Sequence, residues 1–263
     1  MNSSLDVVLV QEASSLDPAD NRAAITRLVT AAITAGGAHR ADLVVLPEAF
    51  ARDFGDAGSD VSDFAEPLDG PFVRCLSAVA AQHGTSVLAG MFEASNDPSR
   101  PFNTLALRGA ASADYRKIHL YDSFGHRESD RLLAGEPTAT VVDVAGWKVG
   151  LMTCYDLRFP EMARALVDAG AEVLVVPAAW VAGPRKVDHW RTLVRARAIE
   201  NTAFVVACGQ PGPRYTGHSM VVDPWGDVVV EAGVEAQVVT ARLDRAALDE
   251  SRHTNPSLLN RRL

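Results

Sequence analysis

The sequence contains few cysteines and no long apolar run. Its three cysteines, Cys75, Cys154 and Cys208, are far apart and form no Cys-x-x-Cys pair, so neither a disulfide framework nor a thiolate zinc site is indicated. No run of about 18 apolar residues occurs, and no basic segment precedes an apolar stretch at the amino terminus, so neither a membrane span nor a secretory signal is predicted. We therefore expect free thiols and a cytoplasmic protein.

Positive charge is also scarce. Lys and Arg number 25 against 33 Asp and Glu, which gives a formal net charge of −8. Because nucleic-acid binding draws its affinity from clustered Lys and Arg, this balance argues against a nucleic-acid partner. Small molecules or other proteins are expected instead. The hydrophobic content of 48% over 263 residues is sufficient for a sizeable core.

Apolar runs typical of strands alternate with helical patterns along the chain, which indicates an α/β domain. Strands are predicted within residues 5–11, 41–48, 85–93, 103–109, 172–179 and 202–209, with a strand pair in 138–154 turning at Ala145 and Gly146, and a hairpin in 218–233 turning at Pro224 to Gly226. Helices are predicted within 18–37, 71–84, 159–170 and 185–201. No linker-like segment divides the chain, so a single domain over residues 1–263 is favoured.

Two segments of the sequence resemble each other. Residues 31–50 and 163–180 each contain a helix end, a Gly-containing cap, an acidic residue, four strand residues and a proline. Two such strand–helix–strand halves can share one core by packing sheet on sheet, with helices on the outer faces. Glu48 in the first copy corresponds to Ala178 in the second, so a carboxylate is not needed to end this strand. The end of the strand therefore does not explain why residue 48 is a glutamate, and a functional role has to be considered.

Cys154 follows an apolar strand and precedes Asp156, Arg158 and a helix that is expected to start near Phe159 or Pro160. A strand-to-helix corner exposes a side chain at the edge of a sheet. A lone cysteine is either inert packing or a nucleophile, and this segment alone leaves both interpretations open.

Lys117 precedes a short stretch with apolar residues such as Ile118 and Leu120, which suggests a segment that packs onto the body of the protein. A lysine in such a segment needs an anionic partner, because an unpaired buried ammonium is costly. Glu48 and Glu128 are the candidates.

Glutamate, lysine and cysteine together suit the attack of a thiol on an amide or nitrile carbon. A thiol has an ordinary pKa of about 8.5, so a positioned carboxylate must accept its proton, and an ammonium or backbone N–H must stabilise the oxyanion that forms. Histidine is the commoner base, but none of the seven histidines has an obvious role with Cys154.

The motifs “LVVLPEAF”, “YRKIHLYD”, “RES” and “GLMTCYDLRFPE”, supported by “RARAIEN” and “GHSMVVDPWGDVV”, occur in this order along the chain. With them the sequence resembles the nitrilase superfamily of carbon–nitrogen hydrolases over nearly its whole length. The resemblance implies a four-layer αββα sandwich with an internal pseudo-two-fold repeat. It also implies a homodimer or higher homo-oligomer, in which two sandwiches form an αββααββα assembly, and no metal or organic cofactor.

Carried over position by position, the resemblance implies that Glu48 is the general base, Lys117 the oxyanion-stabilising lysine and Cys154 the nucleophile. Glu128 matches a second glutamate, which hydrogen-bonds near the lysine and helps to hold substrate and triad in place. The backbone N–H of Tyr155 is implied as the other oxyanion donor.

Within the superfamily, “CYDLRFPE” and “KIHLYD” look most like the branch that hydrolyses small amides of carboxylic acids, which includes ω-amidases and deaminated-glutathione amidases. Nitrilases usually have Trp where Tyr155 stands. Arg158 stands where relatives that bind N-carbamoyl amino acids use Arg on the substrate carboxylate, and Ala179 and Trp180 are expected to line the pocket. The loop from Asp122 to Glu128 is shorter than in the ω-amidase type, so the identity of the amide stays open.

We therefore predict a hydrolase that cleaves a small carboxylic amide to acid and ammonia through a cysteine thioester. An N-carbamoyl amino acid amidohydrolase or a nitrilase is the alternative within the superfamily. A non-catalytic binding member is expected to lack a triad position, and all three are present. A Cys–His enzyme of the glutaminase kind is expected to have a Gly-flanked nucleophile elbow, and “MTCYDLR” has no such glycines.

Overall fold

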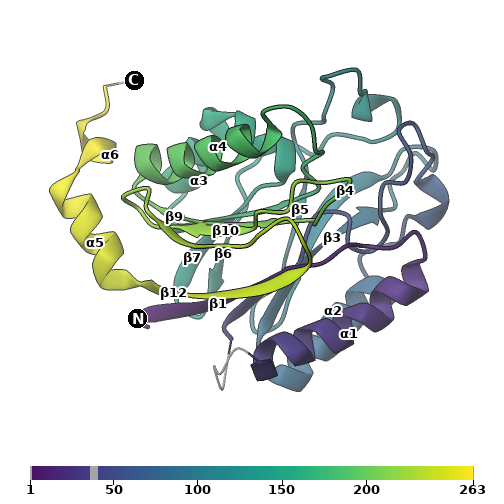
Figure 1. Cartoon of the computed structure of the whole chain (residues 1–263), viewed down its shortest axis with the longest axis horizontal. Coiled ribbons are helices and arrows are strands. Elements are labelled where there is room, and N and C mark those ends of the chain that lie inside the picture. The colour runs from purple at the N-terminus through teal and green to yellow at the C-terminus, as the bar shows by residue number, and fades with distance from the viewer. Residues whose placement is uncertain (1, 36–40, 263) are drawn as a thin grey trace.

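Two six-stranded sheets pack face to face in the computed structural model, which describes residues 2–35 and 41–262 (Figure 1). The first sheet has the order β12-β1-β2-β3-β4-β5, with β1 (Ser4–Gln11), β2 (Leu43–Val45), β3 (Ser86–Glu93), β4 (Phe102–Arg108), β5 (Ala113–Arg116) and β12 (Gln237–Asp244). The second has the order β11-β10-β9-β8-β7-β6, with β6 (Val141–Val144), β7 (Trp147–Leu151), β8 (Val173–Ala178), β9 (Phe204–Gly209), β10 (Met220–Val222) and β11 (Val228–Glu231).

Helices cover the outer face of each sheet. Helices α1 (Pro18–Ala35) and α2 (Pro71–His83) lie on the first sheet, and α3 (Pro160–Asp168) and α4 (Lys186–Asn201) lie on the second, as Figure 1 shows. Helices α5 (Arg245–Thr254) and α6 (Ser257–Asn260) form a carboxyl-terminal extension at one end of the sandwich. The predicted αββα sandwich is therefore confirmed.

The internal repeat is visible in the topology. The series β1-α1-β2-α2-β3-β4-β5 corresponds to β7-α3-β8-α4-β9-β10-β11, and in each series the first three strands are parallel while the last two pair antiparallel. Each half adds one antiparallel strand beside its first strand, β12 in one sheet and β6 in the other. The repeat detected in residues 31–50 and 163–180 thus extends over most of the chain.

Alternate side chains of β1 belong to two different parts of the hydrophobic core. Val7 and Leu9 join the core between the sheets, while Val8 and Val10 pack against the helices on the other face. Successive strand residues point to opposite faces, and both faces of β1 are covered, so the strand is a continuous apolar run. On β9 the thiol of Cys208 donates to the carbonyl oxygen of Val45 across the interface between the sheets, at 3.2 Å.

Some predicted elements have different bounds. The strand predicted within 41–48 contains only β2, because the chain then leaves the sheet in a turn. The helix predicted within 18–37 ends at Ala35, and positions 36 and 37 lie outside the described residues. Strands β5 and β12 and helices α5 and α6 were not predicted. The turn at Ala145 and Gly146 is confirmed, since both residues have positive φ. Within residues 2–35 and 41–262, no helix is long and apolar enough to cross a bilayer.

Candidate active site

Cys154 occupies the corner between β7 and α3. The chain turns there through a 3₁₀ segment, η3 (Cys154–Arg158), before α3 begins at Pro160, so Arg158 ends the short turn and is not in the first turn of α3. The backbone φ of Cys154 is 47°, which is unusual for a residue with a side chain and is typical of functional sites. The chain thus turns sharply at Cys154 although no glycine flanks it.

Asp156 holds this corner in place. Its carboxylate is fully buried and accepts hydrogen bonds from the backbone N–H of Thr153 at 2.8 Å and the hydroxyl of Tyr115 at 2.6 Å. It also accepts from the backbone N–H of His119 and contacts its ring Nδ1 at 2.7 Å. Because Tyr115 and His119 flank Lys117 in sequence, Asp156 ties the segment that carries the lysine to the corner that carries the thiol.

Glu48 follows β2 and is 1% exposed. The turn that carries it rests directly on β3, because a Cβ added at Gly90 would lie 2.3 Å from the backbone nitrogen of Ala49 and 2.8 Å from the Cα of Glu48. Oε1 of Glu48 accepts from Lys117 Nζ at 3.0 Å and from the side-chain amide of Asn103 at 2.8 Å. Oε2 accepts from the backbone N–H of Ala179 at 2.7 Å. Donors from three different segments therefore fix the carboxylate.

Lys117 follows β5 and lies between two carboxylates. Its side chain is 2% exposed, and Nζ is 3.0 Å from Glu48 Oε1 and 2.9 Å from Glu128 Oε2. Burial by itself lowers the pKa of the ammonium, but the charges of Glu128 and Glu48 outweigh it and hold the pKa of Lys117 well above its ordinary value. Lys117 therefore stays positively charged. Both anionic partners that the sequence suggested are in place.

Glu128 begins a second 3₁₀ segment, η2 (Glu128–Asp130), and is 5% exposed. Besides Lys117, its carboxylate accepts from the backbone N–H of Tyr121 at 2.6 Å. The carboxylate of Glu128 thus positions both Lys117 and the loop that follows it.

The Cys154 thiol is held in its neutral form. Burial, and then the negative charge and hydrogen bonding of Glu48, raise the pKa of Cys154 well above its ordinary value, although the charge of Lys117 opposes this. A thiolate is therefore not present beforehand at neutral pH. A base must take the proton when the thiol reacts.

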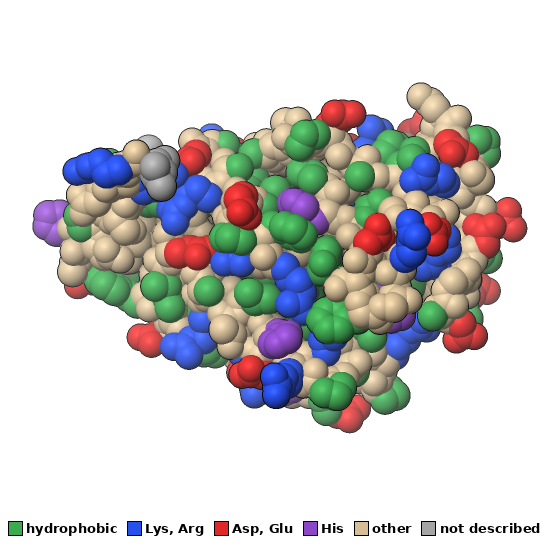
Figure 2. Space-filling model, turned by 90° about the horizontal axis from the view of Figure 1, so that it is seen from above, with side chains coloured by type: hydrophobic (Ala, Val, Ile, Leu, Met, Phe, Trp, Pro, Cys, Tyr) green, Lys and Arg blue, Asp and Glu red, His purple; other side chains and the backbone are tan. Residues whose placement is uncertain are grey.

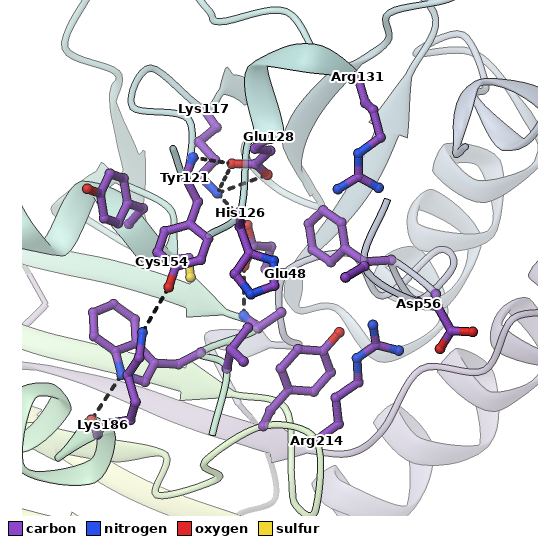
Figure 3. Close-up of a pocket in the computed structure, with 18 of the residues that line it drawn as sticks. Glu48, Asp56, Lys117, Tyr121, His126, Glu128, Arg131, Cys154, Lys186 and Arg214 are labelled. Atoms are coloured by element: carbon purple, nitrogen blue, oxygen red, sulfur yellow. Dashed lines mark hydrogen bonds and ion pairs between the residues drawn. The ribbon is translucent and has the colours of Figure 1, made fainter. Parts of the chain in front are cut away.

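A cavity of about 120 Å³ brings these groups together (Figure 3). In Figure 3 the sulfur of Cys154 faces the same cavity as the side chains of Glu48, Lys117 and Glu128. Every site residue predicted from the sequence lines this cavity: Glu48, Lys117, Glu128, Cys154, Tyr155, Arg158, Ala179 and Trp180. In the part of the chain that the structure describes, no cluster of three or more His, Cys, Asp or Glu side chains is arranged to hold a metal ion.

Several residues of the site were missed from the sequence, among them His126, Arg131 and Arg214, which also line the cavity. Asn103 donates to Glu48, Tyr121 lines the cavity, and Lys186 lines it at the start of α4. A polar residue inside the buried strand predicted at 103–109 was a usable signal for Asn103, because buried polar groups are normally hydrogen-bonded. “RKVDHW” is typical of a solvated helix start, so nothing local distinguishes Lys186. Ala179 lines the cavity as expected, but its N–H serves Glu48.

Residues 7–253 match the carbon–nitrogen hydrolase family. The protein belongs to this family. As a member, it is a carbon–nitrogen hydrolase, and relatives match most of its length. The deaminated glutathione amidase of Escherichia coli O157:H7 is 42% identical over 223 residues, which cover 84% of each chain. The deaminated glutathione amidase of Bos taurus is 35% identical over 278 residues, which cover 97% of this chain and 81% of its own length.

Solved structures of carbon–nitrogen hydrolases have the same fold. A superfamily protein from Xanthomonas campestris, with an arsenic adduct in its active site, superposes with a TM-score of 0.87 at 33% identity and covers 100% of this chain and 98% of its own. A cysteine-to-alanine mutant of an amidase from Nesterenkonia, in complex with butyramide, superposes with a TM-score of 0.79 at 28% identity and covers 95% of each chain.

Proposed function

We propose that the protein hydrolyses the amide of a small carboxylic acid to the acid and ammonia, through a thioester on Cys154. The observation that carries the proposal is the convergence of Glu48 and Lys117 with Cys154 in one small cavity, with both charged side chains almost fully buried. The names of relatives that are amidases support amide hydrolysis. The cysteine-to-alanine amidase mutant studied with butyramide supports the choice of a cysteine nucleophile.

Formation of the thioester begins with Glu48. Its carboxylate takes the thiol proton, the sulfur forms a bond to the carbonyl carbon, and the carbonyl electron pair moves onto oxygen. The ammonium of Lys117 and the backbone N–H of Tyr155 stabilise this oxyanion. Tyr155 is suited to that role because the first hydrogen bond of η3 is donated by Asp156, so the N–H groups before it have no partner within the turn.

Collapse of the intermediate breaks the C–N bond. Glu48 returns its proton to the leaving nitrogen, ammonia departs, and the acyl group stays on Cys154 as a thioester. Water then attacks the thioester carbon and gives a proton to Glu48, the C–S bond breaks, and the sulfur regains that proton as the acid leaves. Each carboxylate has a separate task, because Glu48 moves the proton while Glu128 positions Lys117.

The walls of the cavity are proposed to hold the rest of the substrate. Trp180 supplies an apolar wall. The backbone N–H of Ala179 holds the carboxylate of Glu48. Arg158 is proposed to contact a carboxylate of the substrate. The guanidinium of Arg158 lies over the ring of Trp180, 4.7 Å from its centroid.

Release of ammonia by Cys154→Ala and wild-type protein tests the proposal. The panel contains simple amides, monoamides of dicarboxylic acids, N-carbamoyl amino acids and nitriles. Wild-type protein is expected to hydrolyse amides, while Cys154→Ala is inactive on all of them. The matched control is Cys75→Ala, which removes a partly exposed thiol on α2 that does not line the cavity.

A covalent intermediate gives an independent readout. Acid quenching of wild-type protein with a slow amide, followed by intact-mass measurement, is expected to reveal the acyl group on Cys154. Appreciable amide hydrolysis by Cys154→Ala would refute the mechanism. If wild-type protein were active only on N-carbamoyl amino acids or only on nitriles, the proposed reaction would be wrong and the corresponding hydrolysis would take its place.

We also propose that the protein is a homodimer that pairs through the surface formed by α4, the turn before β11 and β11. Ile199 on α4, Trp225 in the turn before β11 and Val228 on β11 are apolar and each more than 40% exposed. A hydrogen bond from Arg195 to the carbonyl of Gly226 holds this turn against α4. Figure 2 views the molecule from this side, where hydrophobic side chains are interspersed with basic and acidic ones. A second copy is the proposed cover, since exposed apolar clusters favour association.

A further inference from the structure

A second cavity, of about 400 Å³, lies beside the active-site cavity and takes no part in the proposed chemistry. Its lining comes from three loops that follow strands, within residues 13–16 after β1, 52–59 after β2 and 210–215 after β9. The two cavities share a wall that includes Asp56 and Arg214, which Figure 3 shows on the side of the active-site cavity away from Lys186. Cys154 lines the active-site cavity and not the second one.

The second cavity lies where the internal repeat places a counterpart of the active site. Strand β1 corresponds to β7 and β2 to β8, and each of these pairs of strands is parallel. Ser14 is the third residue after β1, as Cys154 is the third residue after β7. Ligands of α/β sheets bind in the crevice outside the carboxyl ends of parallel strands. Each half of the fold therefore provides such a crevice.

The catalytic groups have no equivalents in the second half of this comparison. Glu48 corresponds to Ala178 in the repeat, and Lys117, the first residue after β5, corresponds to Ala232, the first residue after β11. An alanine can neither take a proton from the hydroxyl of Ser14 nor stabilise an oxyanion. The second cavity is therefore suited to binding a ligand and not to the chemistry of the first.

Arg52 is a buried cation of the second cavity. The residue is 7% exposed, its Nη1 donates to the backbone carbonyl oxygen of Asp53 at 2.8 Å, and its Cζ lies 4.2 Å from the ring centroid of Phe64. Its Nε is buried and has no hydrogen-bond partner. Within residues 2–35 and 41–262, no carboxylate forms an ion pair with Arg52. A buried charge without a counter-charge is costly unless an anion binds beside it.

The acidic residues of the cavity wall do not supply that anion. The carboxylate of Asp53 accepts from Nη1 of Arg214 at 3.0 Å and from the hydroxyl of Tyr215 at 2.7 Å. Asp56 is exposed to solvent. The positive charge of Arg52 is therefore available to a ligand.

Serine hydroxyls accompany this guanidinium. A Cβ added at Gly55 would lie 3.0 Å from Ser59 Oγ and 3.3 Å from Arg52 Nη1, so the hydroxyl and the guanidinium flank the space that Gly55 leaves open. In the same cavity, Ser14 Oγ accepts from the side-chain amide of Gln210 at 2.9 Å, which leaves its own proton free to donate. A guanidinium with hydroxyl donors recognises phosphate and carboxylate groups.

We propose that the second cavity is a ligand site separate from the active site, in which Arg52 and Ser59 bind the phosphate or carboxylate group of a small molecule. A volume of about 400 Å³ lies in the range of small-molecule sites, so there is room for an organic part beside Ser14. The site is connected to the catalytic base, because Gln210 also donates to the backbone carbonyl oxygen of Glu48 at 2.9 Å. This inference does not depend on the proposed reaction.

Calorimetric titration of the protein with inorganic phosphate, and separately with acetate, at constant ionic strength tests the proposal. Wild-type protein is expected to bind at least one of them with a Kd of about 1 mM or tighter. The anion that binds more tightly identifies the group that the site prefers. Arg52→Gln should weaken this binding at least about tenfold, because a hydrogen bond to a charged group changes affinity by roughly 10- to 100-fold.

Ser59→Asp is a second variant, which carries the test if Arg52→Gln does not fold. It places a carboxylate of the protein beside the guanidinium, so it should abolish binding of the added anion. Ser77→Asp is the matched control, because it adds the same charge at an exposed position of α2 that lines neither cavity. Its affinity for the anion should equal that of wild-type protein.

A variant of the active-site cavity decides which cavity the anion occupies. Arg158 lines the active-site cavity and not the second one. Binding that is retained in Arg158→Gln supports the separate site, and binding that is lost there would assign the anion to the active site and refute the inference. Failure of both anions to bind wild-type protein, or unchanged binding in Arg52→Gln or Ser59→Asp, would also overturn it. Cys154→Ala should retain binding, so the outcome is independent of amide hydrolysis.

Discussion

Replacement of Lys117 by Met is expected to destabilise the protein strongly. The change keeps the length of the side chain but removes an ammonium that is 2% exposed and contacts Glu48 at 3.0 Å and Glu128 at 2.9 Å. Two buried carboxylates would then face each other without their cation. Removing one partner of a buried ion pair costs about 3–5 kcal/mol, because the remaining charge is uncompensated.

The contacts of the two glutamates place the expected destabilisation of Lys117→Met in the lower part of that range. Glu48 keeps the N–H donors of Asn103 and Ala179, and Glu128 keeps that of Tyr121. These bonds continue to stabilise the carboxylates, so we expect a loss of about 3 kcal/mol in the free energy of unfolding. The same replacement at Lys148, whose ion pair is half exposed, should cost less than about 1 kcal/mol.

Urea unfolding at pH 8, followed by circular dichroism, measures both effects. Lys117→Met combined with Glu128→Gln removes one of the two negative charges, so the double variant should be more stable than the single one by about 1–2 kcal/mol. A loss within about 1 kcal/mol for the single variant, or a double variant no more stable than it, would refute the electrostatic account of this cluster. Amide hydrolysis by Lys117→Met should also fall roughly 100- to 1,000-fold, as for loss of an oxyanion donor.

Three further results are expected. Because burial and Glu48 raise the pKa of Cys154, its alkylation by iodoacetamide, followed residue by residue with mass spectrometry, should be slow at pH 7 and still rise about tenfold per pH unit at pH 9. Gly90→Ala should lower kcat at least about tenfold, since the new Cβ would meet backbone 2.3 Å away and displace Glu48. Trp225→Ser should convert a dimer to a monomer in light scattering, because it removes an exposed ring from the proposed interface.

Each of these results has a control in the same chain. Cys208 is fully buried with a pKa raised to about 12 by burial, so it should stay unmodified throughout the alkylation series. Gly233→Ala places its Cβ in open space and should leave kcat near that of wild type. Leu259→Ser removes an even more exposed apolar side chain, on α6, and should not change the oligomeric state. A plateau of Cys154 alkylation by pH 8, full activity of Gly90→Ala, or a dimeric Trp225→Ser protein would contradict the respective argument.

Much of the fold could be predicted because the central strands β1, β2, β3, β8 and β9 are almost wholly buried on both faces, and because helices α1, α2 and α3 each begin with a proline. The comparison of Glu48 with Ala178 singled out Glu48, but the local geometry of the two halves differs there, because Glu48 lies in the turn after β2 while Ala178 is the last residue of β8. Elements without a clear pattern were missed. Strand β12 alternates exposed and buried residues at the sheet edge, and it is fixed by pairing with β1, more than 200 residues away in sequence.

The sequence by itself determined the order of the elements, the repeat and the residue types of the site, because these depend on hydrophobic pattern and short motifs. It could not determine the positive φ of Cys154, which Asp156 and its distant partners hold, or the protonation of the thiol, which depends on burial beside Glu48. Nor could it distinguish Lys186 from a solvated lysine. Only the tertiary structure placed that ammonium beside Arg158 without a carboxylate, because charge, burial and partners are properties of neighbours in space and not in sequence.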